Sequence, residues 1–313
     1  MSGFAEEYRG KVRQVHIEGL SAGGANCFPL HSFDGETPNP PRILFEVWDV
    51  APEDWSPELD LVLGDVYGDS SAWLARAVEA GADGAYLRLK SADPQSVGAP
   101  IAEVAARAAH IVESSPLPLI VIGCGDPDVD SLLLPLVAGA VKGRKIGLGN
   151  AEADSYAPIG KAAQDAGDCV IAYTPMDVSL AKQLNVLLAQ AGMSDQEIIM
   201  DPTCSALGYS FEYAYTVFER DRIAALAQND TKMQAPLLAN VGQETWHVKE
   251  SRGTDEELPG QGDRRTRGLL WEGVTAVCLV LAGADMVVVR HPESIGLIKD
   301  SLSALGERTG TWR

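Results

Sequence analysis

The chain has 313 residues, of which 46% are hydrophobic and 22% are charged, as is typical of a soluble globular protein. Its formal net charge of −19 excludes nucleic acid as a partner, because binding to phosphate groups requires clustered lysine and arginine. No apolar run reaches the roughly 18–20 residues that cross a bilayer, and residues 1–11 do not resemble a secretory signal, so we expect a cytoplasmic protein with no membrane contact.

Residues 1–42 are predicted to form an N-terminal arm or hairpin that packs on the main domain and closes one end of it. Residues 11–17 alternate between apolar and polar side chains, which is typical of a half-exposed strand. A stretch rich in glycine, asparagine and proline follows and extends to residue 41. This composition separates the segment from the regular pattern that begins at residue 43.

From residue 43 onward, short apolar runs alternate with helix-like stretches. The predicted strands are residues 43–48, 85–89, 119–122, 146–148, 169–172, 198–200, 237–239 and 286–289. The helices predicted to follow them are residues 70–80, 97–112, 128–138, 155–166, 178–190, 209–227, 264–282 and 294–304. Continuous apolar runs are typical of parallel strands that are covered by helices. Eight such pairs predict that residues 43–313 form a (β/α)8 barrel of the α/β class, with a doubly wound open sheet as the alternative.

Two glycine-rich turns begin like a dinucleotide-binding fingerprint, GCGDPD at residues 123–128 and GLGNAE at residues 147–152. The third glycine of that fingerprint is replaced by Asp128 in one and by Glu152 in the other. A carboxylate at this position would repel a pyrophosphate group at the helix N-terminus. We therefore exclude NAD binding and interpret Asp126 as the cap of a helix that begins with proline.

Polar side chains at the ends of the predicted strands form the candidate site, because the carboxyl ends of barrel strands converge on one face. The strongest local signal is DPTCSALGY at residues 201–209, after the sixth strand. Its small residues permit close approach of a flat ligand or of a partner's backbone. An ordinary helix-entry loop is the alternative, since such loops favour the same residue types.

The seventh and eighth strands are also followed by candidate site residues. Asn240, Gln243 and Trp246 precede a polar loop that is predicted to extend to about residue 262, and loops of that length are usually functional or disordered. Amide groups beside an aromatic ring suit a planar ligand, or a protein interface anchored by Trp246. After the eighth strand, His291 lies beside Arg290, either as a site residue or as the cap of the last helix.

The cysteines and histidines do not indicate a metal site. The five cysteines are scattered, with none within four positions of another, so their spacing shows no ligand set for zinc or for an iron–sulfur cluster. His16 lies in QVHIEG, which is similar to the DxHxxG loop that supplies a cobalt ligand in many corrinoid proteins. Gln14 replaces the aspartate that orients that imidazole, so we interpret His16 as structural and expect no metal ligand in this chain.

Several of these segments together resemble one known family. They are FPLH (residues 28–31), FDGE (33–36), FEV (45–47), GCGD (123–126), LGNAE (148–152), KQLN (182–185), DP…LGYSFEY (201–213), RG-LWE-VTA (267–276) and RHPE (290–293). In order and spacing they resemble the small subunit of the corrinoid iron–sulfur protein, which is also called the delta subunit of acetyl-CoA decarbonylase/synthase. The likeness covers nearly the whole chain.

The resemblance implies a (β/α)8 barrel that forms a heterodimer with a large subunit carrying an iron–sulfur cluster and a corrinoid. The pair is expected to receive a methyl group from methyltetrahydrofolate or a related pterin, through its methyltransferase. It then passes the methyl group to acetyl-CoA synthase/CO dehydrogenase in the reductive acetyl-CoA (Wood–Ljungdahl) pathway. The mouth of the small subunit's barrel would cover the corrinoid without providing the lower cobalt ligand, and the chain alone would catalyse nothing.

The resemblance does not fix which loops touch the corrinoid, so strand-end position alone gives the expected contacts. They are Asn150, Thr174, Asp201, Thr203, Gly208, Tyr209, Asn240, Gln243, Trp246, Arg290 and His291. The alternative function is a stand-alone barrel methyltransferase that binds methyltetrahydrofolate in its mouth. In that enzyme, Asp201, Asn150 and Asn240 would hold the amide edge of the pterin.

Overall fold

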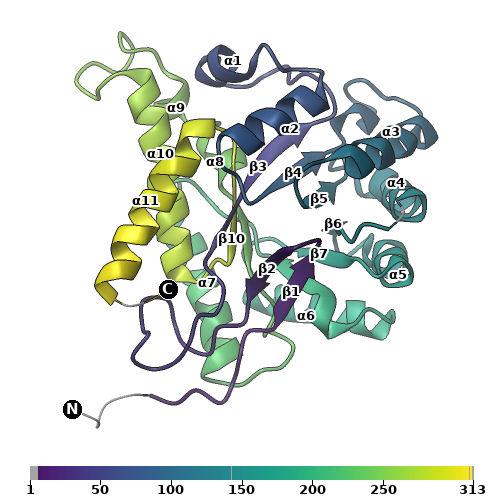
Figure 1. Cartoon of the computed structure of the whole chain (residues 1–313), viewed down its shortest axis with the longest axis vertical. Helices are drawn as coiled ribbons and strands as arrows, with labels where there is room; N and C mark the ends of the chain where they lie inside the picture. The colour runs from purple at the N-terminus through teal and green to yellow at the C-terminus, as the bar shows by residue number, and fades with distance from the viewer. Residues whose placement is uncertain (1–5, 142, 310, 312–313) are drawn as a thin grey trace.

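The computed structural model describes residues 6–141, 143–309 and 311. Within them, eight parallel strands form one sheet in the order β8-β7-β6-β5-β4-β3-β10-β9, with helices around the outside (Figure 1). A parallel bridge between Met200 and Leu237 joins the two end strands and closes the ring. The predicted (β/α)8 barrel is therefore confirmed, and the open sheet is excluded.

The strands of the barrel lie where continuous apolar runs predict them. They are β3 (Arg42–Trp48), β4 (Gly84–Arg88), β5 (Leu119–Ile122), β6 (Gly147–Ala151), β7 (Cys169–Tyr173), β8 (Ile198–Asp201), β9 (Leu238–Asn240) and β10 (Met286–Val289). Their side chains are buried on both faces, toward the helices and toward the barrel interior.

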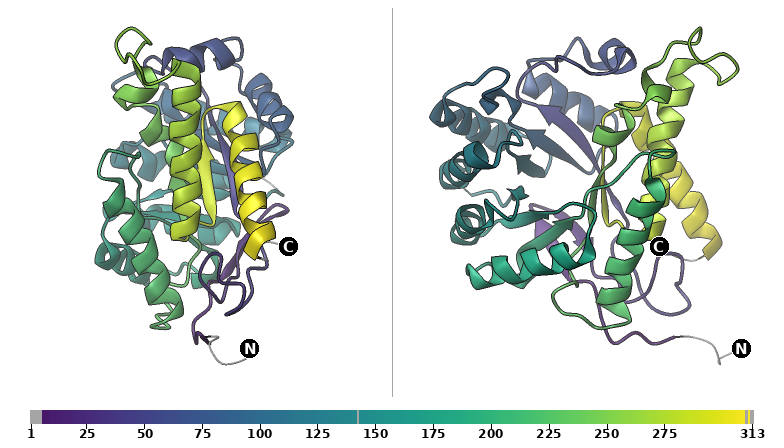
Figure 2. Two further views of the ribbon diagram at one scale, coloured as in Figure 1. Left: turned by 90° about the vertical axis from the view of Figure 1, so that its left-hand side faces the viewer. Right: turned by 180° about the vertical axis from the view of Figure 1, so that it is seen from behind.

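The main helices follow the strands in turn and cover the sheet. They are α2 (Ser70–Glu79), α3 (Ile101–Ser114), α4 (Pro127–Ala140), α5 (Tyr156–Ala166), α6 (Val178–Gln190), α7 (Phe211–Leu226), α10 (Arg264–Ala282) and α11 (Pro292–Thr309). Figure 2 shows α10 and α11 side by side on one flank of the barrel. As the sequence predicts, Asp126 caps α4 by accepting the N–H groups of Asp128 and Val129, and Pro127 is the first helical residue.

Short helices interrupt segments that the sequence predicts as loops. They are α1 (Pro57–Leu63), α8 (Val241–Thr245), α9 (Lys249–Arg252) and the 3-10 turns η1 (Lys90–Ala92) and η2 (Asp195–Glu197). The polar loop that the sequence predicts up to about residue 262 is therefore interrupted by α9. Elements of four to seven residues are too short to show a helical period in the sequence.

An N-terminal hairpin, β1 (Gln14–Ile17) and β2 (Leu20–Gly23), closes the end of the barrel where the strands begin. A Cβ atom at Gly147, the first residue of β6, would lie 3.2 Å from Ile17, which places the hairpin at this end. The hairpin's apolar face packs against the inward side chains Leu44, Tyr86, Ile120, Ile122, Cys169, Ile171, Ile199, Leu238, Met286 and Val288. At this end, the barrel interior is therefore filled by a closed apolar core. The domain boundary that the sequence places at residue 42 stays a prediction.

None of the helices within the described ranges combines the length and hydropathy that a membrane span requires.

Candidate functional site

The carboxyl ends of the strands surround a small polar hollow at the mouth of the barrel. It is lined by Tyr86, Arg88, Tyr173, Asp201, Thr203, Cys204, Asn240, Gln243 and Glu244. The hollow has a volume of about 20 Å³, and a cavity needs at least about 10–15 Å³ to hold one water molecule. With its side chains in these positions, the mouth has space for a water molecule but not for an organic ligand bound inside the barrel.

Arg88, one of the residues that line the hollow, contacts three other side chains. Its Nη2 donates a hydrogen bond to Oε1 of Gln243 over 2.9 Å, and its Nε lies 3.4 Å from Oε1 of Glu46. The guanidinium carbon lies 5.9 Å from the centre of the Tyr86 ring, close enough for a cation–π contact. These contacts fix a positive charge at the exit of β4.

Glu46 holds this arrangement together from inside the sheet. Its carboxylate is fully buried and also accepts hydrogen bonds from Arg290 (2.7 Å from Nε to Oε2) and from Trp48 (2.7 Å from Nε1 to Oε1). Burial alone would raise the pKa of Glu46, but the guanidinium groups of Arg290 and Arg88 lower it below its ordinary value. The carboxylate is therefore ionised and shared between two arginines.

Two other carboxyl groups of the mouth, Asp201 and Glu244, have raised pKa values, in contrast to Glu46. Asp201 ends β8 and is buried, and its Oδ1 accepts the N–H of Thr203 over 2.9 Å. Burial raises the pKa of Asp201 to about 7, and burial also raises the pKa of Glu244. Near neutral pH, the mouth therefore carries less negative charge than its number of carboxyl groups suggests.

Among the predicted site residues, Asp201, Thr203, Asn240 and Gln243 are brought together around this hollow. Asn240 caps α8, because its Oδ1 accepts the N–H of Gln243 over 3.2 Å. The position of a residue at the end of a predicted strand is thus sufficient to identify four of the residues that line the hollow.

Asn150 and Thr174 lie at the neighbouring ends of β6 and β7. The backbone N–H of Thr174 donates to the carbonyl of Asp201 over 3.0 Å. Oδ1 of Asn150 and Oγ1 of Thr174 are buried and have no hydrogen-bond partner within the described residues. Buried polar atoms are rarely unpaired, so this pair indicates a place where a ligand or partner group can bind.

Gly208 and Tyr209 lie farther out, on the exposed loop between β8 and α7. Gly208 has a φ of +79°, which glycine adopts without strain. Tyr209 is 43% exposed and donates from its hydroxyl to Oε2 of Glu250 over 2.8 Å. Both residues belong to the rim of the mouth rather than to its hollow.

Trp246, Arg290 and His291 form a buried layer behind the hollow. Trp246 stacks on His291 with their ring centres 5.7 Å apart, and neither side chain reaches the surface. Nδ1 of His291 accepts the N–H of Glu293 over 3.2 Å, so the imidazole caps α11, which is the second of the two sequence-based alternatives. Burial lowers the pKa of His291 to about 4, which keeps the ring neutral.

Strand-end position in the sequence does not identify Glu46, Arg88 and Glu244 as members of the site. A usable signal was present for Glu46, because a carboxylate in the middle of the apolar run 43–48 must be buried and therefore requires a cationic partner. Nothing local in the sequence shows that this partner comes from Arg88 and Arg290, which lie 42 and 244 positions away.

Within the described ranges, no group of three or more His, Cys, Asp or Glu residues is arranged to hold a metal ion. His16 lies on the hairpin at the opposite end of the barrel, with Nδ1 2.8 Å from Oγ of Ser21.

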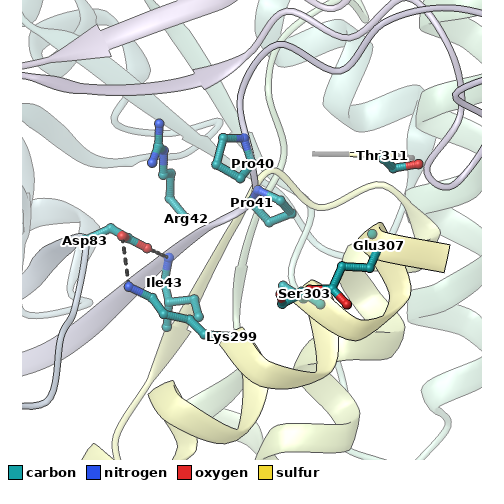
Figure 3. Close-up of a pocket in the computed structure, with 11 residues that line it drawn as sticks. Pro40, Pro41, Arg42, Ile43, Asp83, Lys299, Ser303, Glu307 and Thr311 are labelled. Carbon is teal, nitrogen blue, oxygen red and sulfur yellow. Dashed lines mark hydrogen bonds and ion pairs between the residues drawn. The ribbon is translucent and has the colours of Figure 1, made fainter. Parts of the chain in front are cut away.

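A larger hollow, of about 520 Å³, lies near the start of β3 and along α11 (Figure 3). Its charged side chains largely bind one another or the backbone. Asp83 accepts the N–H of Ile43 over 2.8 Å and pairs with Lys299 over 3.1 Å. We assign the candidate site to the mouth instead, because catalytic and binding groups of barrels gather at the carboxyl ends of the strands.

Comparison with solved structures shows the same fold. Dihydropteroate synthase from Xanthomonas albilineans matches with a TM-score of 0.56 and 16% identity, over 95% of this chain and 98% of the other. The enzyme from Yersinia pestis matches with a TM-score of 0.56 and 13% identity, over 95% and 99%. At this level of identity, the likeness extends to the barrel and not to the chemistry.

Sequence comparison is more specific. The model of the family described as CO dehydrogenase/acetyl-CoA synthase delta subunit matches residues 20–298. The acetyl-CoA decarbonylase/synthase complex subunit delta of Archaeoglobus fulgidus is 31% identical, over 97% of this chain and 70% of the relative. The subunit of the same name from Methanothermobacter thermautotrophicus is 31% identical over 94% and 75%. The chain therefore belongs to the delta subunit family of CO dehydrogenase/acetyl-CoA synthase.

Proposed function

We propose that the chain is the small subunit of a corrinoid iron–sulfur methyl carrier. In this role it covers the corrinoid of a large subunit while a methyl group passes from methyltetrahydropterin to acetyl-CoA synthase in the reductive acetyl-CoA pathway. The observation that carries the proposal is the filled mouth. A hollow of about 20 Å³, packed with paired side chains, suits a wall against a partner's cofactor better than a pocket for a free substrate.

The residues at the mouth fit the edge of a corrinoid. A corrin ring is broad and flat and carries carboxamide groups around its rim, and such groups both donate and accept hydrogen bonds. Asn150 and Thr174 provide polar oxygens without a partner within the described residues, and Asn240 and Gln243 provide amides. When bound, the corrinoid supplies the cobalt that carries the methyl group, and this chain's residues hold the ring and keep water away from it.

The predicted contact residues divide into two roles in this proposal. Those that face the corrinoid are Asn150, Thr174, Asp201, Thr203, Gly208, Tyr209, Asn240 and Gln243. Trp246, Arg290 and His291 are buried behind them and act as positioning residues. Arg290 fixes Glu46, which in turn fixes Arg88 at the edge of the hollow.

The partners follow from the same proposal. The large subunit would provide the iron–sulfur cluster, the corrinoid and any lower cobalt ligand. The methyltransferase and acetyl-CoA synthase/CO dehydrogenase would approach the corrinoid in turn. All of these proteins would meet in the cytoplasm.

The experiment that tests this function separates a subunit from a self-sufficient methyltransferase. The purified chain is given methylated tetrahydropterin and free cob(I)alamin, and methyl transfer is followed by the change in the cobalamin absorption spectrum. We expect no transfer above the uncatalysed rate, because a bicyclic pteridine cannot enter a hollow that holds one water molecule. Addition of the large subunit and the methyltransferase should restore transfer, whereas turnover by the chain alone would contradict the proposal.

A further inference from the structure

The exposed side of α4 is apolar, although most exposed helix faces carry charge. Leu132 is 61% exposed and Leu136, one turn later, is 49% exposed. Pro135 and Gly139 lie on the same side, and Leu133 on the other side is buried in the barrel wall. Residues 132–140 of α4 carry no charged side chain, and an apolar helix surface is normally covered, so this exposed side of α4 indicates a surface for another protein.

This side of α4 forms one wall of a groove whose other wall is α5, which lies next to it on the flank away from α10 and α11 (Figure 1). The groove has a volume of about 730 Å³. It is lined by Ser131, Leu132, Pro135, Leu136, Ala138, Gly139, Val141, Pro158, Lys161, Ala162, Asp165 and Ala166. We call it the α4–α5 groove. Its many small side chains permit the close approach of another helix, and Pro135, which has no N–H, leaves the carbonyl of Ser131 without its usual helical donor.

The charges around the α4–α5 groove are unequally distributed. Lys161 and Asp165 within it pair with each other over 2.8 Å. At the end nearest the mouth lie carboxylates that form no salt bridge within the described ranges, namely Asp126, Asp128, Glu152 and Asp154. Burial and the neighbouring Asp130 and Asp154 raise the pKa of Glu152, as expected where acidic groups crowd together.

A second copy of this chain is a poor occupant for the groove, because each copy carries a net charge of −19 and the two would repel each other. A basic helix with one apolar face is complementary both to the leucines and to the acidic end. The groove also begins close to the mouth end of the barrel, since Ser131, its first lining residue, lies about one turn into α4, which follows the carboxyl end of β5. A protein that covers the mouth therefore passes over the acidic end of the groove.

We propose that the α4–α5 groove binds a helix of the large, corrinoid-bearing subunit. That helix presents leucine-like side chains to Leu132 and Leu136, and lysine or arginine to Asp128 and its acidic neighbours. This inference rests on the proposed function. It adds that the large subunit contacts the α4–α5 flank of the barrel as well as the mouth.

The test measures the dissociation constant between the full-length chain and the purified large subunit of the same organism. The variant L132E/L136E should weaken binding at least about tenfold, because it places charges where apolar surface is buried. The matched control is L180E, which changes a leucine that is 44% exposed on α6 and should change binding less than about twofold. D128N should reduce the dependence of binding on salt concentration. Thermal unfolding confirms that each variant is folded, since all the changed side chains are exposed or at a helix start.

The outcomes separate this inference from the proposed function. If the wild-type chain binds the large subunit and L132E/L136E binds equally well, the groove assignment is wrong while the subunit function stands. If the wild-type chain does not bind the large subunit, both are wrong. Sedimentation of the chain alone adds one further check, because a dimer that L132E/L136E dissociates would assign the groove to a second copy and overturn the proposal.

Discussion

Glu46 is the residue on which the geometry of the mouth depends, because its one buried carboxylate pairs with two arginines, Arg88 at the end of β4 and Arg290 directly after β10. Replacement by glutamine keeps the shape but removes the charge, and it leaves the guanidinium groups of Arg88 and Arg290 buried without a counter-ion. We expect E46Q to lower the free energy of unfolding by about 3–5 kcal/mol, as measured by urea denaturation.

The control for E46Q is D65N, which breaks the exposed pair between Asp65 and Arg76. Exposed pairs contribute at most about 1 kcal/mol, so D65N should have little effect. Equal losses in the two variants would show that the Glu46 network contributes no more than a surface ion pair.

Asp221 on α7 is a buried carboxyl group whose oxygens have no hydrogen-bond partner within the described residues. Burial raises its pKa from 3.8 to about 7. The folded state therefore holds this proton more tightly than the unfolded chain does. Protonated Asp221 therefore contributes to the free energy of unfolding. This contribution is fully present below about pH 3.8 and is lost as the pH rises through about 7.

D221N removes this titration, so its stability relative to the wild type should improve as the pH rises. The gain between pH 4 and pH 8 is expected to be on the order of 4 kcal/mol, measured as the difference between the urea unfolding free energies of the two proteins. Asp201 titrates in the same range in both proteins and cancels in this difference. If the unfolding free energies of D221N and wild type changed equally with pH, Asp221 would not have the raised pKa.

At the scale of elements, the glycine-rich turn after β5 shows why a motif that resembles a nucleotide-binding loop is structural. The carboxylate of Asp130 folds back onto the turn and accepts the N–H groups of Cys124 (2.8 Å) and Gly125 (3.0 Å). A Cβ atom at Gly123 would lie 2.1 Å from Oδ1 of Asp130. The glycine is required because a side chain at this position would collide with the carboxylate of Asp130.

G123A should therefore disturb this turn and lower the free energy of unfolding by about 1–3 kcal/mol. The matched change is G296A in α11, where a Cβ atom would meet nothing within 4 Å. Alanine is the better helix former there, so G296A should raise stability by about 0.5–1 kcal/mol. Opposite signs in thermal unfolding check the account, and destabilisation by both variants would contradict it.

The sequence predicts the barrel well because its strands are buried on both faces and its helices are long enough to show their period. Helix α6 begins and ends where predicted, at Val178 and Gln190. The short helices α8 and α9 could not be predicted, because they are stabilised by packing against α10 rather than by a local pattern.

The candidate site is predictable only in part for a related reason. Strand-end position finds Asp201, Asn240 and Gln243, because topology alone brings these positions together. It does not reveal where each side chain points, so it also selects Trp246 and His291, which turn inward to become part of the core. Long-range partners such as Glu46 and Arg290 are visible only in three dimensions.

At the scale of the whole molecule, the barrel is closed at both ends, by the β1–β2 hairpin at one end and by paired polar side chains at the other. Ile17 is buried among the inward side chains of the strands. I17A should leave a cavity in this plug and lower the free energy of unfolding by about 2–5 kcal/mol. The control V97A, at a position that is 53% exposed, should have almost no effect in the same assay. A small loss for I17A would mean that the hairpin is not part of the core.

The central claim is that the mouth of this barrel is a wall that covers another subunit's corrinoid. Hydrogen–deuterium exchange of the chain, with and without the corrinoid-loaded large subunit, tests it most directly. We expect slower amide exchange at residues 150–154, 201–209 and 240–246 when the complex forms. Unchanged exchange in these three segments, with the large subunit demonstrably bound, would contradict it.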